Sequence, residues 1–301
     1  MIIEDVRQLR EIHCDVLLTI GTFDGYHLGH QKVISALLDE SRRLGCPSVA
    51  VTFLNSPREV ISKKSIPYVM DPYEKLQFLK NAGVDYVVAL PFTQQLRHMT
   101  APTFLEYLGL RVRKLIVGYD FRFGYKGSDP ASSLKIPVMK VEAHIIDGHI
   151  VSSTLLRELM ALGDIERLNA SLGRFYSYRA SVIRGYGTGG SLGFPTLNLN
   201  IRPNLYTLRK GVYITNAHIE GNVYQSVTSV GNRPTFPGRS FSIETHLLDT
   251  KGDFYEEEVT LEFLSFIRDE ITFDSRQELI DQIERDVAKT REHFKSLHTK
   301  I

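Results

Sequence analysis

A glycine-rich stretch near the start of the chain, GTFDGYHLGHQ at residues 21–31, constrains the fold most strongly. The apolar, β-branched run at residues 15–20 comes directly before it and predicts a buried strand. After it, apolar residues recur at helical spacing from Val33 to Leu38, and Gly45 ends the pattern. The stretch therefore predicts a strand that leads through a tight turn into the N-terminus of a helix.

The predicted turn suits an anion, because backbone N–H groups and the positive end of a helix dipole point at whatever lies above it. His27 and His30 are three residues apart at the helix start, and Gly29 leaves no side chain to hold a nucleotide away. A solvated histidine pair and half of a metal site are the alternatives. A metal site needs further ligands, and no Cys/His cluster elsewhere in the chain supplies them.

The turn also lacks the Lys-Ser/Thr ending of a Walker A loop, so we interpret it as a phosphate site built from imidazoles. In this respect it resembles the His-x-Gly-His signature of adenylyl-transferring nucleotidyltransferases. Contacts to the nucleotide are expected from Gly21, Phe23, Asp24 and Gly29.

Composition narrows the class of protein. The 301 residues are enough for two domains with separate cores. A net charge of +1 disfavours a nucleic-acid partner, since binders of the phosphate backbone carry a basic excess. Only Cys14 and Cys46 occur, so no disulfide framework is expected. With no signal-peptide layout and no apolar run long enough to span a bilayer, we expect a soluble cytoplasmic protein.

The first half alternates strands and helices. Apolar runs predict strands at residues 15–20, 48–53, 86–90, 114–117 and 137–141. Capping signals predict helices that begin near Asp71 and Thr100, and two more helices follow at residues 153–162 and 164–172. Short strands separated by helices favour an α/β domain with a doubly wound parallel sheet, whose ligands lie at the carboxyl ends of the strands.

After Gly173 the pattern changes to alternation. Strands are predicted at residues 177–183, 212–219, 223–230, 242–248 and 259–267, with turn signals between them. This spacing is typical of an antiparallel β-barrel. A helix capped by Ser275 and Glu278 closes the chain and presents an apolar face to the barrel. We therefore predict two domains, at residues 1–174 and 175–301.

Two further stretches carry chemistry in the first half. Residues 117–124 follow a strand end, where Asp120 is placed to bind a ribose or a base edge; the alternative is a turn aspartate beside core aromatics. Residues 151–157 start a helix in which Ser153, Thr154 and Arg157 suit a departing pyrophosphate. The alternative there is an ordinary serine N-cap with a solvated arginine.

Taken in this order, the motifs at residues 21–30, 117–124 and 152–157 resemble the bacterial riboflavin kinase/FAD synthetase family, and the resemblance extends over nearly the whole chain. It implies that the first half transfers AMP from ATP to FMN and releases pyrophosphate, with His27, His30 and Arg157 as catalytic residues. The family commonly has Asp-Pro-His-Pro after the second strand, where this chain has LNSP at residues 54–57. The segment after Gly124 is also shorter than usual.

The second half contains the stretch RGYGTGGSLGFPTLN at residues 184–198. Its GxGxxG spacing fits a dinucleotide fingerprint, but it follows an alternating strand and leads into Phe194-Pro195 rather than a helix, which rejects that interpretation. A glycine-rich loop that folds over phosphates remains, with Gly185 and Gly193 in it. The oxygens of Thr196 and Asn198 suit Mg²⁺ held together with ATP phosphates. Read alone, this Pro-Thr-x-Asn segment is a turn.

The motifs at residues 192–198, 211–213, 231–236, 244–249 and 267–270 resemble the riboflavin kinase module in its order. The resemblance implies that Glu244 is the general base for the ribityl hydroxyl, that Thr196 and Asn198 form the Mg-ATP site, and that Arg268 contacts the flavin phosphate. Gly190 stands where the family usually has Arg, and Leu197 replaces the common Ala.

The leading hypothesis is a two-step enzyme that converts riboflavin to FMN and FMN to FAD. One alternative is a riboflavin kinase whose first half is catalytically weak or inactive; another is a flavin-binding regulatory protein. We expect Mg²⁺ to accompany ATP, and FMN and FAD to be substrate and product rather than redox cofactors. Riboflavin, FMN and ATP are the expected partners, with no nucleic acid, no membrane and at most weak self-association.

Overall fold

The computed structural model describes residues 1–122, 124–125, 134–185, 190, 192–202, 204–232, 241–250 and 252–298. The predicted motif residues Phe123, 126–129, 186–189, 191 and 233–236 lie outside this part of the chain. Contacts divide the chain into two compact units. The first comprises Met1–Leu156 with Asn204–Tyr206, and the second comprises Arg157–Pro203 with Thr207–Ile301.

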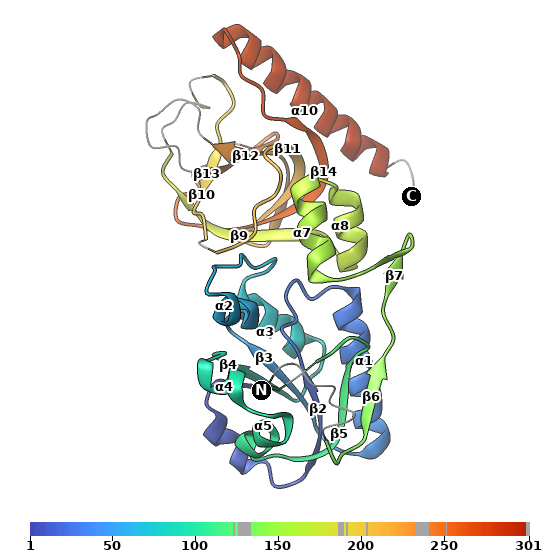
Figure 1. The fold of residues 1–301 in the computed structure, drawn as a ribbon. Helices are drawn as coiled ribbons and strands as arrows, with labels where there is room; N and C mark the ends of the chain where they lie inside the picture. The colour runs from blue at the N-terminus through green and yellow to red at the C-terminus, as the bar shows by residue number, and fades with distance from the viewer. Residues whose placement is uncertain are drawn as a thin grey trace. The chain divides into compact units, whose positions relative to one another are not determined.

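The first unit is built on a six-stranded parallel sheet with the strand order β1-β4-β3-β2-β5-β6 (Figure 1). Its strands are β1 (Ile2–Ile3), β2 (Asp15–Ile20), β3 (Ser48–Phe53), β4 (Tyr86–Leu90), β5 (Arg111–Gly118) and β6 (Val138–Val141). Its helices are the 3-10 helix η1 (Val6–Glu11), α1 (Leu28–Leu44), α2 (Pro57–Ser62), α3 (Pro72–Asn81), α4 (Gln94–His98) and α5 (Ala101–Leu108). A separate pair joins β7 (Ile145–Ile146) to β8 (His149–Ile150).

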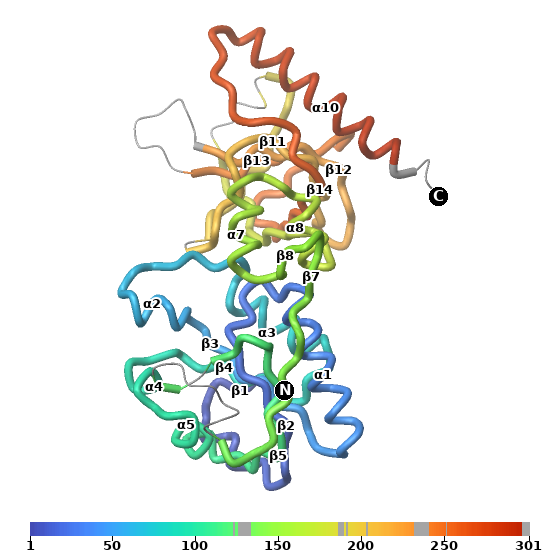
Figure 2. The backbone as a smooth tube through the Cα atoms, turned by 45° about the vertical axis from the view of Figure 1, so that its right-hand side comes forward, coloured from blue at the N-terminus to red at the C-terminus, as the bar shows by residue number. Residues whose placement is uncertain are grey.

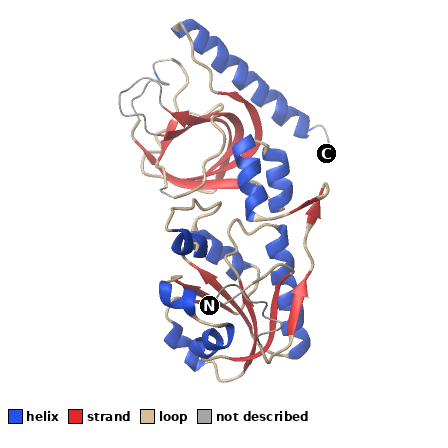
Figure 3. Cartoon of the chain, viewed as in Figure 1, coloured by secondary structure: helices blue, strands red, loops and turns tan. Residues whose placement is uncertain are grey.

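Strand β2 shows why this sheet is covered on both faces. Leu18 belongs to a core cluster with Phe104 of α5, whereas its neighbour Leu17 belongs to a second cluster with Ile34 of α1 and Leu76 of α3. Successive side chains of a strand point to opposite faces, so two cores form, one against each helical layer. The predicted doubly wound sheet is confirmed (Figure 3).

The strand order also locates the ligand edge of this sheet. The chain passes from β2 to β3 and β4 on one side and then returns to place β5 on the other side of β2. In an open α/β sheet, ligands bind beyond the carboxyl ends of the strands at this reversal. The two segments that follow β2 and β5 are the glycine-rich turn and the stretch that contains Asp120.

Several short elements were not predicted. Each has six residues or fewer: β1, η1, α2, α4, β7, β8 and the barrel strand β10 (Leu197–Leu199). Elements of this length show too few repeats for a hydrophobic period to be recognised, because their position depends on the sheet edge or helix against which they pack.

The second unit is a closed antiparallel barrel with the order β10-β13-β12-β11-β14-β9 (Figure 2). Its strands are β9 (Tyr176–Ile183), β10 (Leu197–Leu199), β11 (Gly211–Ile219), β12 (Asn222–Asn232), β13 (Phe241–Leu247) and β14 (Glu258–Asp269). Helix α7 (Ser153–Leu162) precedes α8 (Ile165–Leu172), and α10 (Arg276–His298) closes the chain. Phe294 of α10 packs against Ile214 and Leu264, so the predicted barrel with its closing helix is confirmed.

Side chains inside the barrel fix which residues face outward. Thr215, Ser226, Thr228 and Thr245 are fully buried, and their hydroxyl groups hydrogen-bond to one another at 2.6–2.9 Å. Alternation along β13 then places Glu244, next to the inward-facing Thr245, on the outer face of the barrel.

The contact boundary falls inside α7, between Leu156 and Arg157. The change from helical periodicity to alternation after Gly173 instead marks the start of β9. The predicted boundary between the two functional domains, at 174/175, stays a prediction. Residues 204–206 belong to the first unit because Tyr68 donates a hydrogen bond to the carbonyl of Asn204 at 2.7 Å and accepts one from the N–H of Tyr206 at 2.6 Å.

Candidate functional site

The turn after β2 has an unusual backbone. Phe23 and Tyr26 have φ values of 48° and 38°, in the left-handed region that non-glycine residues rarely adopt. Gly25 has a φ of 82°, and a Cβ atom there would lie 2.6 Å from the end of the Leu156 side chain, so both the backbone and the packing favour glycine. A strained backbone of this kind persists only where surrounding contacts fix it, and strained residues occur most often at binding and active sites.

Asp24 and Ser153 provide some of those contacts. The carboxylate of Asp24 accepts hydrogen bonds from the N–H groups of Val69 at 2.9 Å and Met70 at 3.3 Å. Its carbonyl accepts one from the hydroxyl of Ser153 at 2.8 Å. The turn is thereby joined to the start of α7, as expected if both stretches belong to one site. Both side chains have structural partners here, and direct contacts from them to ATP or flavin stay a prediction.

His27 and His30 form one unit at the helix start. Nδ1 of His27 accepts a hydrogen bond from the N–H of His30 at 3.3 Å, so His27 is the N-cap of α1 and carries no proton on Nδ1. The two imidazole rings stack at a centroid distance of 3.6 Å and an interplanar angle of 18°. The ring of Phe23 meets His30 edge-on at 5.3 Å.

The environment of His30 keeps its ring neutral. Burial lowers the pKa of His30 well below its usual value, and the neighbouring His27 and Lys75 lower it further. Its Nδ1 atom is buried and has no hydrogen-bond partner among the described residues. A buried, unsatisfied ring nitrogen is rare in a folded protein and marks a position for a ligand or a mechanism.

Glycines keep the backbone close to these rings. A Cβ atom on Gly29 would lie 3.1 Å from the ring of His27 and 3.3 Å from the carbonyl of Val151. A Cβ atom on Gly21 would lie 2.9 Å from the ring of Phe23. Both positions therefore favour glycine for close packing, which agrees with a turn that brings backbone N–H groups near a ligand.

The helix start at α7 is only partly as expected. The hydroxyl of Ser152 accepts a hydrogen bond from the N–H of Leu155 at 3.2 Å, so this serine caps the helix. Thr154 is exposed, and Arg157 is half-buried one turn further along. Asp120 is exposed beyond β5, the strand next to β2.

Lys75 is a charged residue of this region that the sequence analysis missed. It lies on α3 and is only 5% exposed. Its ammonium group donates hydrogen bonds to the carbonyls of Thr22 at 2.8 Å and Phe53 at 2.7 Å. A signal for it was present, since Lys75 is four residues before Leu79, on the apolar stripe of the helix, where a lysine needs buried partners.

In the barrel, the pairing of the strands places the predicted kinase residues Asn198 and Glu244 directly opposite each other. Asn198 lies opposite Glu244, and Glu244 lies opposite Ser229 on its other side. Opposed residues share a face, with Cβ atoms about 4.5–5.5 Å apart. The same row continues through Val212 to Arg268.

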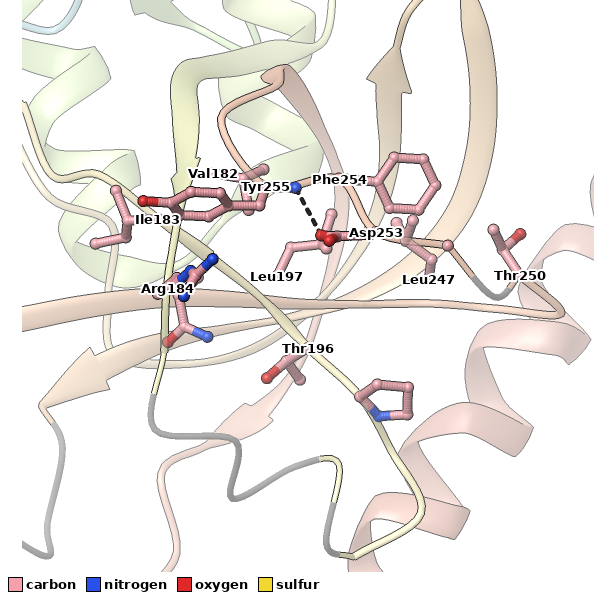
Figure 4. A pocket seen from close by; sticks show the side chains of 13 residues that line it. Val182, Ile183, Arg184, Thr196, Leu197, Leu247, Thr250, Asp253, Phe254 and Tyr255 are labelled. Atoms are coloured by element: carbon pink, nitrogen blue, oxygen red, sulfur yellow. Dashed lines mark hydrogen bonds between the residues drawn. The ribbon is translucent and has the colours of Figure 1, made fainter.

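A pocket of about 490 Å³ opens beside this row (Figure 4). Thr196 and Asn198 line it, together with Arg184 from the end of β9 and Asp253 and Tyr255 from the loop before β14. The carboxylate of Asp253 accepts a hydrogen bond from the N–H of Tyr255 at 3.1 Å, and the guanidinium of Arg184 lies 4.8 Å from the centre of the Tyr255 ring. The pocket thus offers oxygen donors, a cation and an aromatic face.

Gly185 leaves room for the side-chain amide of Asn198 beside this pocket. A Cβ atom on Gly185 would lie only 2.1 Å from Nδ2 of Asn198, so any other residue would displace that side chain. Gly193 has a φ of 91°, and a Cβ atom there would meet no atom of the described residues within 4 Å. Glycine is therefore favoured at position 193 by the backbone conformation of the loop, and at position 185 by the close approach of the Asn198 side chain.

Arg268 has a partner that the sequence analysis did not foresee. Its guanidinium binds both carboxylate oxygens of Asp286 on α10 at 2.7–3.1 Å, and it donates to the carbonyl of Asp269 at 2.9 Å. Asp286 is 2% exposed and the side chain of Arg268 is 16% exposed, so this largely buried ion pair joins α10 to the barrel. The predicted contact of Arg268 with a flavin phosphate stays a prediction.

Other features bear on the expected class of protein. Cys14 and Cys46 are both free thiols. In the described ranges, no three His, Cys, Asp or Glu side chains gather as metal ligands. No helix in the part of the chain searched has the length and apolar character that a membrane span requires.

Family models match both halves of the chain. The riboflavin kinase model matches residues 172–294, and the FAD synthetase model matches residues 9–155. A solved structure described as a macrolide-efflux protein from Streptococcus pneumoniae has a TM-score of 0.87 at 28% identity, and covers 97% of this chain and 98% of that one.

Curated relatives extend this match to full length. The chain is 33% identical over 291 residues to the bifunctional riboflavin kinase/FMN adenylyltransferase of Haemophilus influenzae, covering 93% of this chain and 94% of that protein. The Pseudomonas fluorescens protein of the same name is also 33% identical, with 96% of each chain covered. The resemblance seen in the motifs is thereby confirmed: this chain belongs to the family of bifunctional riboflavin kinase/FMN adenylyltransferases.

Proposed function

We propose that this enzyme makes FAD in two ATP-dependent steps at two sites. The barrel pocket phosphorylates riboflavin to FMN, and the turn after β2 transfers AMP from ATP to FMN with release of pyrophosphate. The observation that carries the proposal is the position of Glu244 opposite Asn198, which puts a carboxylate next to the pocket that holds the predicted metal ligands.

In the kinase step, Glu244 accepts the proton of the terminal ribityl hydroxyl while that oxygen attacks the γ-phosphorus of ATP. The bond between the γ-phosphorus and the β–γ bridging oxygen breaks, and ADP leaves. A phosphoryl transition state of this type is loose, so alignment and charge neutralisation provide most of the acceleration.

Thr196 and Asn198 would hold Mg²⁺ in this pocket. Their hydroxyl and amide oxygens are the hard donors that this ion prefers, and two protein ligands suit an ion that phosphates also coordinate. Bound there, Mg²⁺ neutralises phosphate charge. Gly185 leaves space for the amide of Asn198, and Gly193 lets the loop turn beside it.

In the adenylyl step, an FMN phosphate oxygen attacks the α-phosphorus of ATP, and pyrophosphate leaves. A phosphate is already a competent nucleophile, so no covalent enzyme intermediate is required. His27, His30 and the N–H groups of the turn would hold the triphosphate, and Arg157 would neutralise the leaving pyrophosphate. Asp120, at the neighbouring strand end, would bind a ribose or a base edge.

The altered loop at residues 54–57 bears on the alternative of a kinase with a weak first half. The side-chain amide of Asn55 pairs with the main chain of Phe92, donating at 2.9 Å and accepting at 2.6 Å, and the N–H of Ser56 binds the Tyr68 hydroxyl at 3.3 Å. This loop is thus fixed by its own contacts. A fixed loop is compatible with substrate binding, and the two-step function remains our conclusion.

The test is to incubate the full chain with riboflavin and Mg-ATP and to separate the flavins by chromatography. We expect FMN first and FAD later. FMN as the end product, with no FAD formed from added FMN, would support the kinase-only alternative. Binding of flavin without turnover would support a regulatory protein.

We assign the adenylyl step to residues 1–174 and the kinase step to residues 175–301. The two free thiols fit a reducing cytoplasm. Riboflavin, FMN and ATP are the proposed small-molecule partners, with at most weak self-association.

A further inference from the structure

Lys75 contacts the turn that we assign to adenylyl transfer, through the carbonyl of Thr22. It is almost fully buried, and lysine is rarely buried without partners because its ammonium group loses hydration. Its described hydrogen bonds go to two main-chain carbonyls, Thr22 and Phe53. The partners of this cation are therefore backbone positions that have no side-chain charge of their own.

Those two carbonyls stand at the ends of adjacent strands. Phe53 is the last residue of β3, and Thr22 follows the end of β2 and directly precedes the left-handed Phe23. Strands β2 and β3 pair in parallel up to Ile20 and Val51. The ammonium thus joins two strand ends at the point where the turn towards His27 and His30 begins.

Charged and titratable groups surround this ammonium from two elements. Asp24 lies in the turn and Asp71 at the start of α3, and both raise the pKa of Lys75, while burial, the larger effect, brings it down to about 8. The positive charge of Lys75 acts in turn on His30, which also faces His27. Lys75 therefore interacts with the imidazole pair electrostatically as well as through the backbone.

We propose that Lys75 is a positioning residue for adenylyl transfer, whose ammonium fixes the carbonyls of Thr22 and Phe53 so that the turn holds its N–H groups and the His27–His30 pair against the triphosphate. This inference rests on the proposed location of that site. A displacement of about 1 Å in such a constellation can lower a rate about 100-fold.

The experiment uses the full chain with three substitutions at two positions of α3. Lys75→Met removes the charge and both hydrogen bonds at similar volume, Lys75→Arg keeps a charged donor, and the matched control Lys80→Met removes an exposed lysine from the same helix. FAD formation from FMN and Mg-ATP is measured alongside riboflavin phosphorylation, and His30→Ala is assayed in parallel.

We expect Lys75→Met to lower kcat for FAD formation about 10- to 100-fold while riboflavin phosphorylation changes less than about twofold. Lys75→Arg should recover part of the loss, and Lys80→Met should match the unmodified enzyme. In NMR titrations, the pKa of His30 should rise in Lys75→Met, because a positive charge near the ring has been removed. This shift tests whether the charge of Lys75 acts on the imidazole pair, and the difference between the two activities tests its positioning role.

Unchanged FAD formation in Lys75→Met, beside a large loss in His30→Ala, would overturn the role of Lys75 and leave the site in place. An unchanged rate in His30→Ala would instead overturn the site itself. If Lys75→Met does not fold, Lys75→Gln takes its place under the same criteria. Equal loss of both activities in Lys75→Met would show a structural role only.

Discussion

The imidazole rings of His27 and His30 lie face to face, 3.6 Å apart, at the first turn of α1. Two stacked imidazolium rings would repel each other, and the lowered pKa of His30 keeps one ring neutral near physiological pH. The main-chain bond that His27 accepts from His30 requires the proton of a neutral His27 to be on Nε2. The pair can therefore donate a hydrogen bond without a fixed positive charge on both rings.

Replacing His30 should separate the two activities. We expect His30→Ala to lower FAD formation from FMN about 100- to 1,000-fold, because it removes a group that holds the triphosphate, and to leave riboflavin phosphorylation intact. His149→Ala, an exposed histidine on β8, is the control. A normal rate of FAD formation in His30→Ala would remove the imidazole from the mechanism.

Replacing Glu244 should have the opposite effect. Glu244→Gln keeps the shape of the side chain but cannot accept the ribityl proton, so kinase turnover should fall about 100- to 10,000-fold while FAD formation from FMN is retained. The comparison variant is Glu258→Gln, an exposed glutamate of β14. Steady-state rates with each flavin would reveal a shared site if both activities fell together.

Two glycines of one loop give a matched test of the pocket. Gly185→Ala should raise the KM for Mg-ATP in the kinase reaction about tenfold or more, because the new Cβ would displace the amide of Asn198 and disturb a metal ligand. Gly190→Ala brings its Cβ within 4 Å of no atom in the described part of the chain and should have little effect. Titration of the kinase with Mg²⁺ at fixed ATP is the measurement; equal KM values in the two variants would contradict the role of Asn198.

The adenylyl step should lose activity in alkaline solution. Lys75, with a pKa of about 8, carries its charge below that pH and loses it above, so kcat/KM for Mg-ATP should fall as the pH rises through about 8. This quantity reports the free enzyme. The arginine in Lys75→Arg stays charged, so the decline in kcat/KM should move to higher pH. If the pH profiles of the two proteins are the same, a group other than Lys75 causes the decline.

The ion pair between Arg268 and Asp286 should stabilise the barrel unit. Asp286→Ala leaves the partly buried guanidinium of Arg268 without its carboxylate partner, and we expect the free energy of unfolding to fall by about 3 kcal/mol. Arg291, on the same helix as Asp286, forms an exposed ion pair with Asp249 in the loop after β13, and Arg291→Ala should change stability little. Urea unfolding followed through kinase activity would show whether the two variants differ.

The sequence alone determined the local elements and their chemistry. The run before Gly21 and the periodic residues after His30 were sufficient to place β2, the turn and α1, and alternation was sufficient to place five of the six barrel strands. The helix N-caps were also predictable from the sequence, since Asp71 and Ser275 accept hydrogen bonds from N–H groups in the first turns of their helices. These features depend on neighbours within a few residues, which periodicity and capping patterns report directly.

Tertiary structure decided which of these elements meet. The carbonyls bound by Lys75 are 53 and 22 residues away from it, and the pairing of Arg268 with Asp286 depends on how α10 lies on the barrel. Glu244 neighbours Asn198 only because of the strand order and register of the closed barrel. Such contacts follow from packing of whole sheets and helices, a non-local balance of burial and hydrogen bonding that no short sequence window contains.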